Sequence, residues 1–118
     1  MKANELRIGN YLIDNTDRIS TVTELNNWED GCYLLNDDFE GFSGFYEIRP
    51  LRLTEDWLLK FGFKKETKHY FIIGNLLIRK VSDCFTFRGG NFQTVIVKYV
   101  HQLQNLYFAL TGEELEIK

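Results

Sequence analysis

The sequence predicts an α+β fold with four parts in order: a small curled antiparallel sheet, a short helix, a four-strand antiparallel meander, and a C-terminal helix packed on the sheet. Three patterns lead to this prediction. Short β-rich runs separated by turn residues fill the first 49 positions, and two glycine-centred hairpins lie between residues 68 and 99. Near the C-terminus, apolar residues recur at helical spacing.

Length and composition agree with a globular protein of one domain. The chain has 118 residues, of which 44% are hydrophobic and 26% charged, a balance typical of folded chains. Ten Phe, six Tyr and two Trp give it a large apolar surface to bury. We expect a single domain, 1–118, that combines a strand-rich subassembly, 1–49, with a helix–meander–helix subassembly, 50–118.

The strand-rich subassembly begins with two short strands between Leu6 and Leu25, joined by the polar turn Asp14–Asp17. A third strand is expected at Cys32–Leu35. A glycine-rich loop then leads to a fourth strand near Tyr46–Ile48. Strands this short and this closely spaced predict a curled sheet or a small barrel, SH3-like in scale.

A short helix is expected after Pro50. Thr54 is suited to the N-cap because its side chain can accept a hydrogen bond from the first turn, where Glu55 and Asp56 follow it. Gly62 is suited to the position just after the helix, where a left-handed backbone is common. The helix is about two turns long, so packing must stabilise it.

Two hairpins follow this helix. In KHYFIIGNLLIRKV, the pair Gly74-Asn75 separates two β-rich runs and predicts a two-residue turn. In DCFTFRGGNFQTVIVKY, the turn runs from Arg88 to Asn91. Together the hairpins predict the four-strand antiparallel meander.

The stretch YVHQLQNLYFALTGEEL near the C-terminus has the spacing of an amphipathic helix, which Gly112 ends before an edge strand at Glu114–Ile117. One side is apolar and is expected to pack on the meander. That side consists of Tyr99, Val100, Leu103, Leu106, Tyr107 and Leu110. The opposite side aligns His101, Asn105 and Phe108, and packing of the helix does not explain a phenylalanine there.

Charge is unevenly distributed along the chain, whose net charge is −3. Residues 1–63 carry a balance of −6, residues 64–112 a balance of +5, and residues 113–118 a balance of −2. An acidic front and a basic back favour an anion-contacting face or head-to-tail self-association. Solvated charges that keep a protein soluble give the same pattern.

Basic and aromatic residues interleave between Lys64 and Lys80, a combination typical of contact with nucleotides. We expect a small anionic, nucleotide-like ligand, because no basic helix is present to enter the groove of duplex nucleic acid. The residues expected to bind it are Tyr70, Arg79, Arg88, Lys98, His101, Asn105 and Phe108. The loop Phe87–Asn91 could also present N–H groups to an anion, although a hairpin turn requires glycines there in any case.

Motifs for a metal or for covalent catalysis are missing. The His and Cys residues have no zinc-type spacing, so we expect no metal and no cofactor. Acid–base catalysis by His101 with Glu113 or Asp83 has no supporting spacing, so we expect no enzyme activity. Cys32 and Cys84 are interpreted as buried free thiols. The chain start lacks the apolar run of a signal peptide, and no segment is apolar enough to span a membrane, which predicts a cytoplasmic protein without membrane contacts.

Three blocks of sequence carry a family resemblance: KANELRIGNYL (Lys2–Leu12), LTEDWLLKFGF (Leu53–Phe63) and YVHQLQNLYFALTGEEL (Tyr99–Leu115). They resemble uncharacterised small proteins of bacteriophages and prophages of Bacteroidota. This resemblance implies a phage accessory protein in the cytoplasm of the host cell. It implies no catalytic residues.

The sequence therefore favours a non-enzymatic phage accessory binding protein, homo-oligomeric, that acts on a host component. In its sharper form, this hypothesis holds that the protein sequesters a small nucleotide signal of host defence. The alternative is a protein–protein adaptor, a structural accessory or an inhibitor that docks on a host or phage protein. Its contact would be Phe39, Phe42 and Phe45 in the glycine-rich loop.

Overall fold

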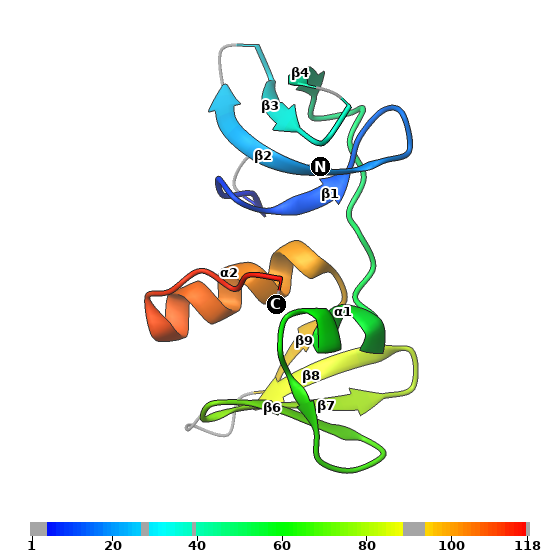
Figure 1. The fold of residues 1–118 in the computed structure, drawn as a ribbon, viewed down its shortest axis with the longest axis vertical. Helices are drawn as coiled ribbons and strands as arrows, with labels where there is room; N and C mark the ends of the chain where they lie inside the picture. The colour runs from blue at the N-terminus through cyan, green and yellow to red at the C-terminus, as the bar shows by residue number, and fades with distance from the viewer. Residues whose placement is uncertain (1–4, 27–28, 39, 89–93, 118) are drawn as a thin grey trace. The chain divides into compact units, whose positions relative to one another are not determined.

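The structure is a computed structural model that describes residues 5–26, 29–38, 40–88 and 94–117, with the backbone alone at 88 and 94. It confirms the α+β fold (Figure 1). The described residues form two antiparallel sheets, in the orders β1-β2-β3-β4 and β5-β6-β7-β8-β9, and neither closes into a barrel. The elements are β1 (Tyr11–Ile13), β2 (Ile19–Asn26), β3 (Gly31–Leu35), β4 (Glu40–Gly44), α1 (Glu55–Lys60), β5 (Lys64–Lys65), β6 (Tyr70–Ile73), β7 (Leu76–Val81), β8 (Cys84–Arg88), β9 (Thr94–Val97) and α2 (Val100–Thr111).

The chain divides into two compact units that are discontinuous in sequence. One comprises Met1–Leu51 and Tyr99–Glu114, and the other comprises Arg52–Lys98 and Leu115–Lys118. We call them the acidic unit and the basic unit, from their charges given below. The subassemblies expected from the sequence, 1–49 and 50–118, placed α2 with the meander, whereas this division places α2 with the N-terminal sheet.

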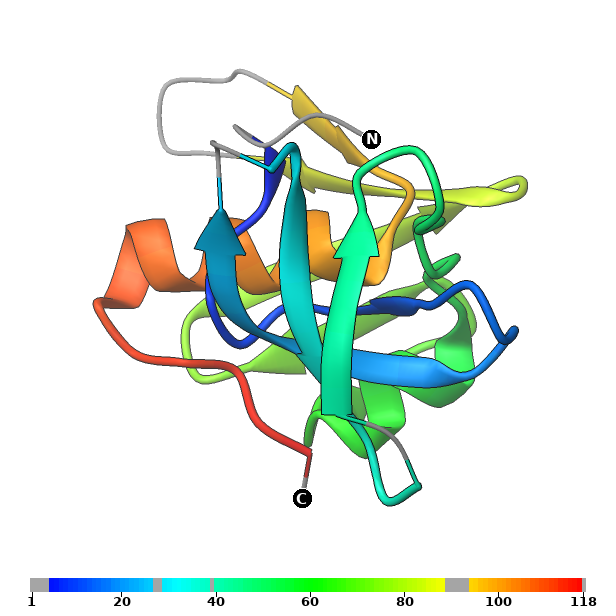
Figure 2. The ribbon, with the colours of Figure 1, turned by 90° about the horizontal axis from the view of Figure 1, so that it is seen from above.

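The acidic unit contains the four-stranded meander, in which β2, β3 and β4 lie side by side (Figure 2). Val22 pairs with Leu34, and a bulge between Val22 and Glu24 interrupts the pairing of β2 with β3. Apolar side chains on one face form its core, namely Leu6, Leu12, Val22, Cys32, Leu34 and Ile48, with Leu25 and Phe45 packed against them.

The fourth strand lies at Glu40–Gly44 rather than near Tyr46–Ile48. A turn occupies the predicted position, where the N–H of Glu47 donates to the carbonyl oxygen of Gly44 at 2.9 Å. Glycine weakens local strand propensity, so pairing with β3 rather than local sequence decides where this strand forms.

Helix α2 confirms the helix predicted from apolar spacing. Tyr99 is its N-cap residue, with its N–H donating to Oε1 of Gln102 at 3.2 Å, and Gly112 ends it in a left-handed conformation at φ 74°. Within the acidic unit, α2 contacts β1. The edge strand predicted at Glu114–Ile117 is absent, because those residues have no strand pairing.

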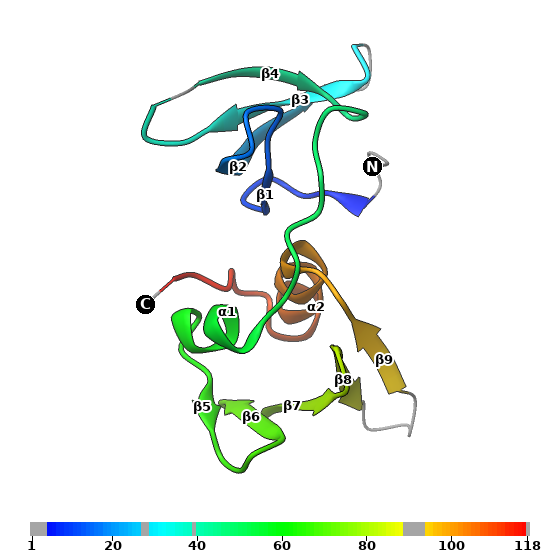
Figure 3. The same cartoon turned by 90° about the vertical axis from the view of Figure 1, so that its right-hand side faces the viewer.

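In the basic unit, α1 begins and ends where the sequence predicts. Oγ1 of Thr54 accepts a hydrogen bond from the N–H of Trp57 at 3.4 Å, and Gly62 adopts a left-handed backbone at φ 94° after the last turn. Helix α1 lies over the sheet near β5 and β6 (Figure 3). Trp57 and Leu58 are buried on its inner side.

The meander of the basic unit has five strands rather than four, because β5 adds a two-residue edge beside β6. The hairpin at Gly74-Asn75 is confirmed by the pairing of Ile73 with Leu76. The second hairpin is confirmed by the pairing of β8 with β9, although its turn lies largely outside the described residues. One face of the sheet is apolar and buried, and it carries Phe71, Ile78, Phe85 and Val97.

Candidate functional site

The two compact units carry opposite charges. The acidic unit has four Lys or Arg against twelve Asp or Glu, a balance of −8, and the basic unit has ten against five, a balance of +5. This separation is sharper than the one visible along the sequence, because the acidic C-terminal residues Glu113 and Glu114 belong with the N-terminal sheet. The basic unit is therefore the part of the chain suited to an anion.

A cleft of about 320 Å³ in the basic unit gathers several of these charges. Its lining residues come from the start of α1, from β5, from the loop before β6, and from the end of β7. They are Glu55, Lys65, Lys68, His69, Lys80 and Ser82. Three ammonium groups and one imidazole thus face a cleft that holds one carboxylate.

Backbone pairing brings these residues together. The N–H of Lys80 donates to the carbonyl oxygen of His69 at 2.7 Å, which holds the loop before β6 against the end of β7. Lys65 lies beside them because it pairs with Phe71. Since side chains alternate along a strand, Lys80 points to the opposite face of the sheet from its neighbour Arg79.

Glu55 organises the lysines of the cleft. Its carboxylate accepts hydrogen bonds from Nζ of Lys65 at 2.8 Å and from Nζ of Lys80 at 3.1 Å. These hydrogen bonds hold the pKa of Glu55 below its ordinary value, so the carboxylate is ionised at neutral pH. It places two ammonium groups at fixed positions, and Lys68 adds a third positive charge to the same cleft. Such a cluster can bind a phosphate or carboxylate by charge-assisted hydrogen bonds.

The predicted ligand residues of the basic unit lie elsewhere on its sheet. Tyr70 pairs with Arg79 across β6 and β7, and the guanidinium lies 5.9 Å from the centroid of the tyrosine ring. Lys98 is exposed just after β9. Arg88 is the last residue of β8, and its side chain lies outside what the structure describes, as do residues 89–93 of the predicted glycine loop.

His101, Asn105 and Phe108 belong to the acidic unit, and two of them contact Arg7 rather than an empty surface. The Arg7 guanidinium lies 4.0 Å from the centroid of the Phe108 ring. Nη1 of Arg7 donates to Oδ1 of Asn105 at 2.9 Å, and Nδ2 of Asn105 donates to the carbonyl oxygen of Glu5 at 3.0 Å. The phenylalanine that helix packing leaves unexplained therefore contacts the N-terminal segment.

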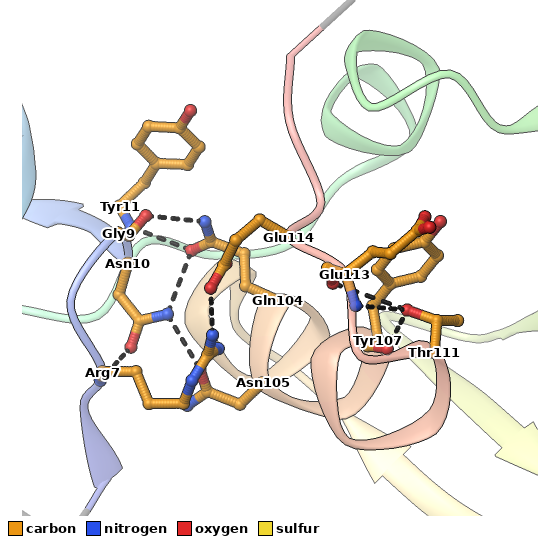
Figure 4. Close-up of polar contacts among 10 residues, drawn as sticks. All are labelled: Arg7, Gly9, Asn10, Tyr11, Gln104, Asn105, Tyr107, Thr111, Glu113 and Glu114. Atoms are coloured by element: carbon orange, nitrogen blue, oxygen red, sulfur yellow. Dashed lines mark hydrogen bonds and ion pairs between the residues drawn. The ribbon is translucent and has the colours of Figure 1, made fainter.

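These contacts are part of a larger polar cluster, the polar clasp, drawn in Figure 4. Oε1 of Gln104 accepts from the N–H of Tyr11, and Nε2 of Gln104 donates to the carbonyl oxygen of Gly9, both at 2.9 Å. Nδ2 of the buried Asn10 donates to Oδ1 of Asn105 at 2.9 Å. The clasp consists of Arg7, Gly9, Asn10, Tyr11, Gln104, Asn105 and Glu114, with Arg7 also ion-paired to Glu114.

The polar clasp joins two stretches from opposite ends of the chain, Arg7–Tyr11 and Gln104–Glu114. Helical spacing in the sequence places Asn105 and Phe108 on one side of the helix but cannot reveal their contact with Arg7, which is separated from Asn105 by 98 positions. The only signal was the mismatch between a polar helix side and its phenylalanine. In this arrangement, Asn105 binds the N-terminal segment through its side-chain hydrogen bonds.

His101 is buried, with 3% of its surface exposed, and its Nδ1 has no hydrogen-bond partner in the described part of the chain. Burial lowers its pKa, and the negative charge of Glu5 opposes that shift only in part. The imidazole is therefore neutral at pH 7. It lines a cavity of about 250 Å³ with Glu5, Pro50 and Tyr99. A neutral ring beside a carboxylate is poorly suited to the phosphate contact expected of His101.

Neither cysteine forms a disulfide. Cys32 is buried, and burial raises the pKa of its thiol to about 11, so it stays protonated. Cys84 was expected to be buried but is only half-buried. Its side chain lies on the face of the sheet opposite the buried face that carries Phe85. In the described ranges no cluster of three His, Cys, Asp or Glu could hold a metal ion.

The phenylalanines of the glycine-rich loop do not form one exposed contact. Phe45 packs against the core of the acidic unit, and Phe42 is exposed on β4, where its ring meets Tyr33 edge-on with centroids 5.6 Å apart. Phe39 lies outside the described residues. Tyr46 is the more exposed ring in this part of the unit.

Comparison with known proteins identifies no relative. No protein-family model matches the chain, and no curated protein or solved structure is significantly similar to it. Over the residues that the structure covers, no helix is both long and apolar enough to cross a lipid bilayer.

Proposed function

We propose that the protein is a non-enzymatic binding protein whose basic unit holds a small phosphate-bearing anion in the cleft lined by Lys65, Lys68, His69 and Lys80. The observation that carries this proposal is a cleft lined by three lysines, of which Lys65 and Lys80 donate hydrogen bonds to the carboxylate of Glu55. Two lysines are already oriented by that carboxylate, so an incoming anion orders fewer side chains on binding.

The size of the cleft suggests the size of the ligand. A volume of about 320 Å³ is at the lower end of the range of small-molecule sites, about 300–1,000 Å³. It suits a phosphate group with a small organic part, such as a mononucleotide, better than a large oligonucleotide. Together with the phage resemblance, this supports the hypothesis that the protein sequesters a nucleotide signal of host defence.

Isothermal titration calorimetry of the full chain with pyrophosphate, a nucleoside monophosphate and a cyclic dinucleotide tests this proposal. Lys68→Ala should weaken binding of the preferred anion about tenfold, because a direct charge-assisted hydrogen bond is lost. Lys64→Ala is the matched control, since Lys64 neighbours Lys65 on β5 but does not line the cleft. No binding of any of these anions, or equal weakening by both variants, would refute the proposal.

A further inference from the structure

The two edges of the five-stranded sheet differ in how they are protected. The β5 edge is two residues long and consists of Lys64 and Lys65, both exposed. Short strands and lysines are the usual means of preventing an edge from pairing with another chain. The β9 edge is the uncharged run Thr94–Val97, which is four residues long and rich in β-branched side chains. Only one of the two edges is therefore protected.

Exposure of β9 agrees with an open edge. Ile96 is 56% exposed on one face of the sheet, and Val95 is 41% exposed on the other, although Val97 beside them is buried. Ile96 pairs with Thr86 of β8, and in the described ranges β8 is the one strand that pairs with β9. The far side of β9 thus presents a strand edge flanked by two apolar side chains.

We propose that β9 pairs antiparallel with β9 of a second copy of this chain, so that two five-stranded sheets join across a two-fold axis. Such an axis runs perpendicular to the sheet and keeps the buried face of each copy on the same side. Residues opposite each other must then point to the same face. Ile96 opposite Ile96 satisfies this condition and pairs the whole segment Thr94–Lys98.

The chemistry of this register favours a second copy over a foreign strand. Val95 lies opposite Val97, and Thr94 lies opposite Lys98, so no like charges face each other. The run carries no charge of its own with which to select a foreign partner. Two copies carry like charge both as whole chains, at −3 each, and in the basic units that meet, at +5 each, so long-range repulsion opposes the dimer and added salt should strengthen it. An acidic foreign strand would bind with the opposite salt dependence.

Sedimentation equilibrium of the full chain over a range of concentrations tests the dimer. Ile96→Lys copies the protection seen at β5 and should weaken dimerisation at least about tenfold, because two lysines would face each other. Its circular dichroism should stay unchanged, and so should its melting temperature at concentrations where both chains are monomeric, since Ile96 is exposed in the single chain. Leu77→Lys is the control, because Leu77 is 44% exposed on the interior strand β7. That variant should dimerise like the wild type.

Crosslinking tests the register. In a Cys84→Ser background, Ile96→Cys should form an intermolecular disulfide under mild oxidation, whereas Leu77→Cys should not, because only opposed residues bring their Cβ atoms close enough. A wild-type chain that is monomeric at every concentration overturns the proposal. Equal loss of the dimer in both lysine variants also overturns the proposal, because the contact would then lie on the face of the sheet rather than at its edge. A dimer that added salt weakens overturns it as well.

Discussion

At the scale of single residues, the carboxylate of Asp14 shows how this fold stabilises a buried charge. It accepts five hydrogen bonds, from the N–H and hydroxyl of Thr16, the N–H of Arg18, the hydroxyl of Ser20 and the amide of Asn36. Burial by itself would raise the pKa of Asp14, but these hydrogen bonds outweigh burial and lower the pKa to about 2. The residue organises the β1–β2 turn.

Asp14→Asn should therefore destabilise the protein in a pH-dependent way. A pKa lowered from 3.8 to about 2 on folding contributes about 2 kcal/mol at neutral pH. That contribution is complete above pH 3.8 and is lost as the pH falls towards 2. Urea unfolding of both proteins across this range should show their free energies of unfolding converging in acid. Asp37→Asn, an exposed control, should match the wild type throughout, and a constant gap for Asp14→Asn would contradict this explanation.

The site residues show how far single positions could be predicted. Helical spacing marked Phe108 as unexplained and placed Asn105 on the same side, and both have partners in the structure. Spacing describes one element and cannot identify a partner elsewhere in the chain. The cleft lysines were visible as a basic and aromatic run. Their use of one cleft was not, because it depends on Glu55 reaching Lys65 and Lys80 from another element.

At the scale of elements, the polar side of α2 holds the N-terminal segment by side-chain hydrogen bonds to its backbone. Gln104 is buried and satisfies two main-chain groups, the N–H of Tyr11 and the carbonyl oxygen of Gly9. Truncation of the Gln104 side chain would remove the partner of both main-chain groups and would also create a cavity. Buried polar groups that lose their partner are costly.

Gln104→Ala should lower the free energy of unfolding by about 2–3 kcal/mol, since two main-chain hydrogen bonds are lost together. Leu110→Ala on the same helix should lower it by no more than about 0.5 kcal/mol, because an exposed side chain contributes little. Chemical denaturation with matched m-values measures both. Equal losses would contradict the assignment of this stability to the polar clasp, because alanine lowers the helix propensity of neither position.

The elements that could be predicted are those whose signals are local. Thr54 and Gly62 delimit α1 through their own backbone preferences, and Gly74-Asn75 forms its turn for the same reason. Strands β4 and β5 could not be predicted, because glycines in one and lysines in the other have low strand propensity. Both form because a neighbouring strand offers them hydrogen-bond partners.

At the scale of the whole molecule, two units of opposite charge are built from interleaved stretches of one chain. The sequence predicts a boundary between subassemblies at Pro50, because Pro50 ends a run of predicted strands. Residues 99–114 instead return to the N-terminal sheet through the polar clasp. The assignment of residues 99–114 to the acidic unit depends on long-range hydrogen bonds, which no local sequence pattern predicts.

The effect of Glu55 on anion binding depends on its charge as well as on its position in the cleft. Glu55 both orients two lysines and places a negative charge beside the proposed anion, and these effects oppose each other. Glu55→Gln removes the charge but keeps an oxygen that can accept a hydrogen bond from Lys65 or Lys80. Binding of the preferred anion should strengthen about fivefold at low salt, because the repulsion between the carboxylate and the anion is lost.

Salt separates the two roles of Glu55. Repulsion between charges is screened at high ionic strength, so the gain from Glu55→Gln should shrink towards zero as salt is added. A loss of orientation would not be screened and would persist at every salt concentration. Titration calorimetry of wild type and Glu55→Gln at low and high salt makes the measurement. Weaker binding by Glu55→Gln at both salt concentrations would show that orientation of the lysines dominates, and that the net charge of the cleft does not set its affinity.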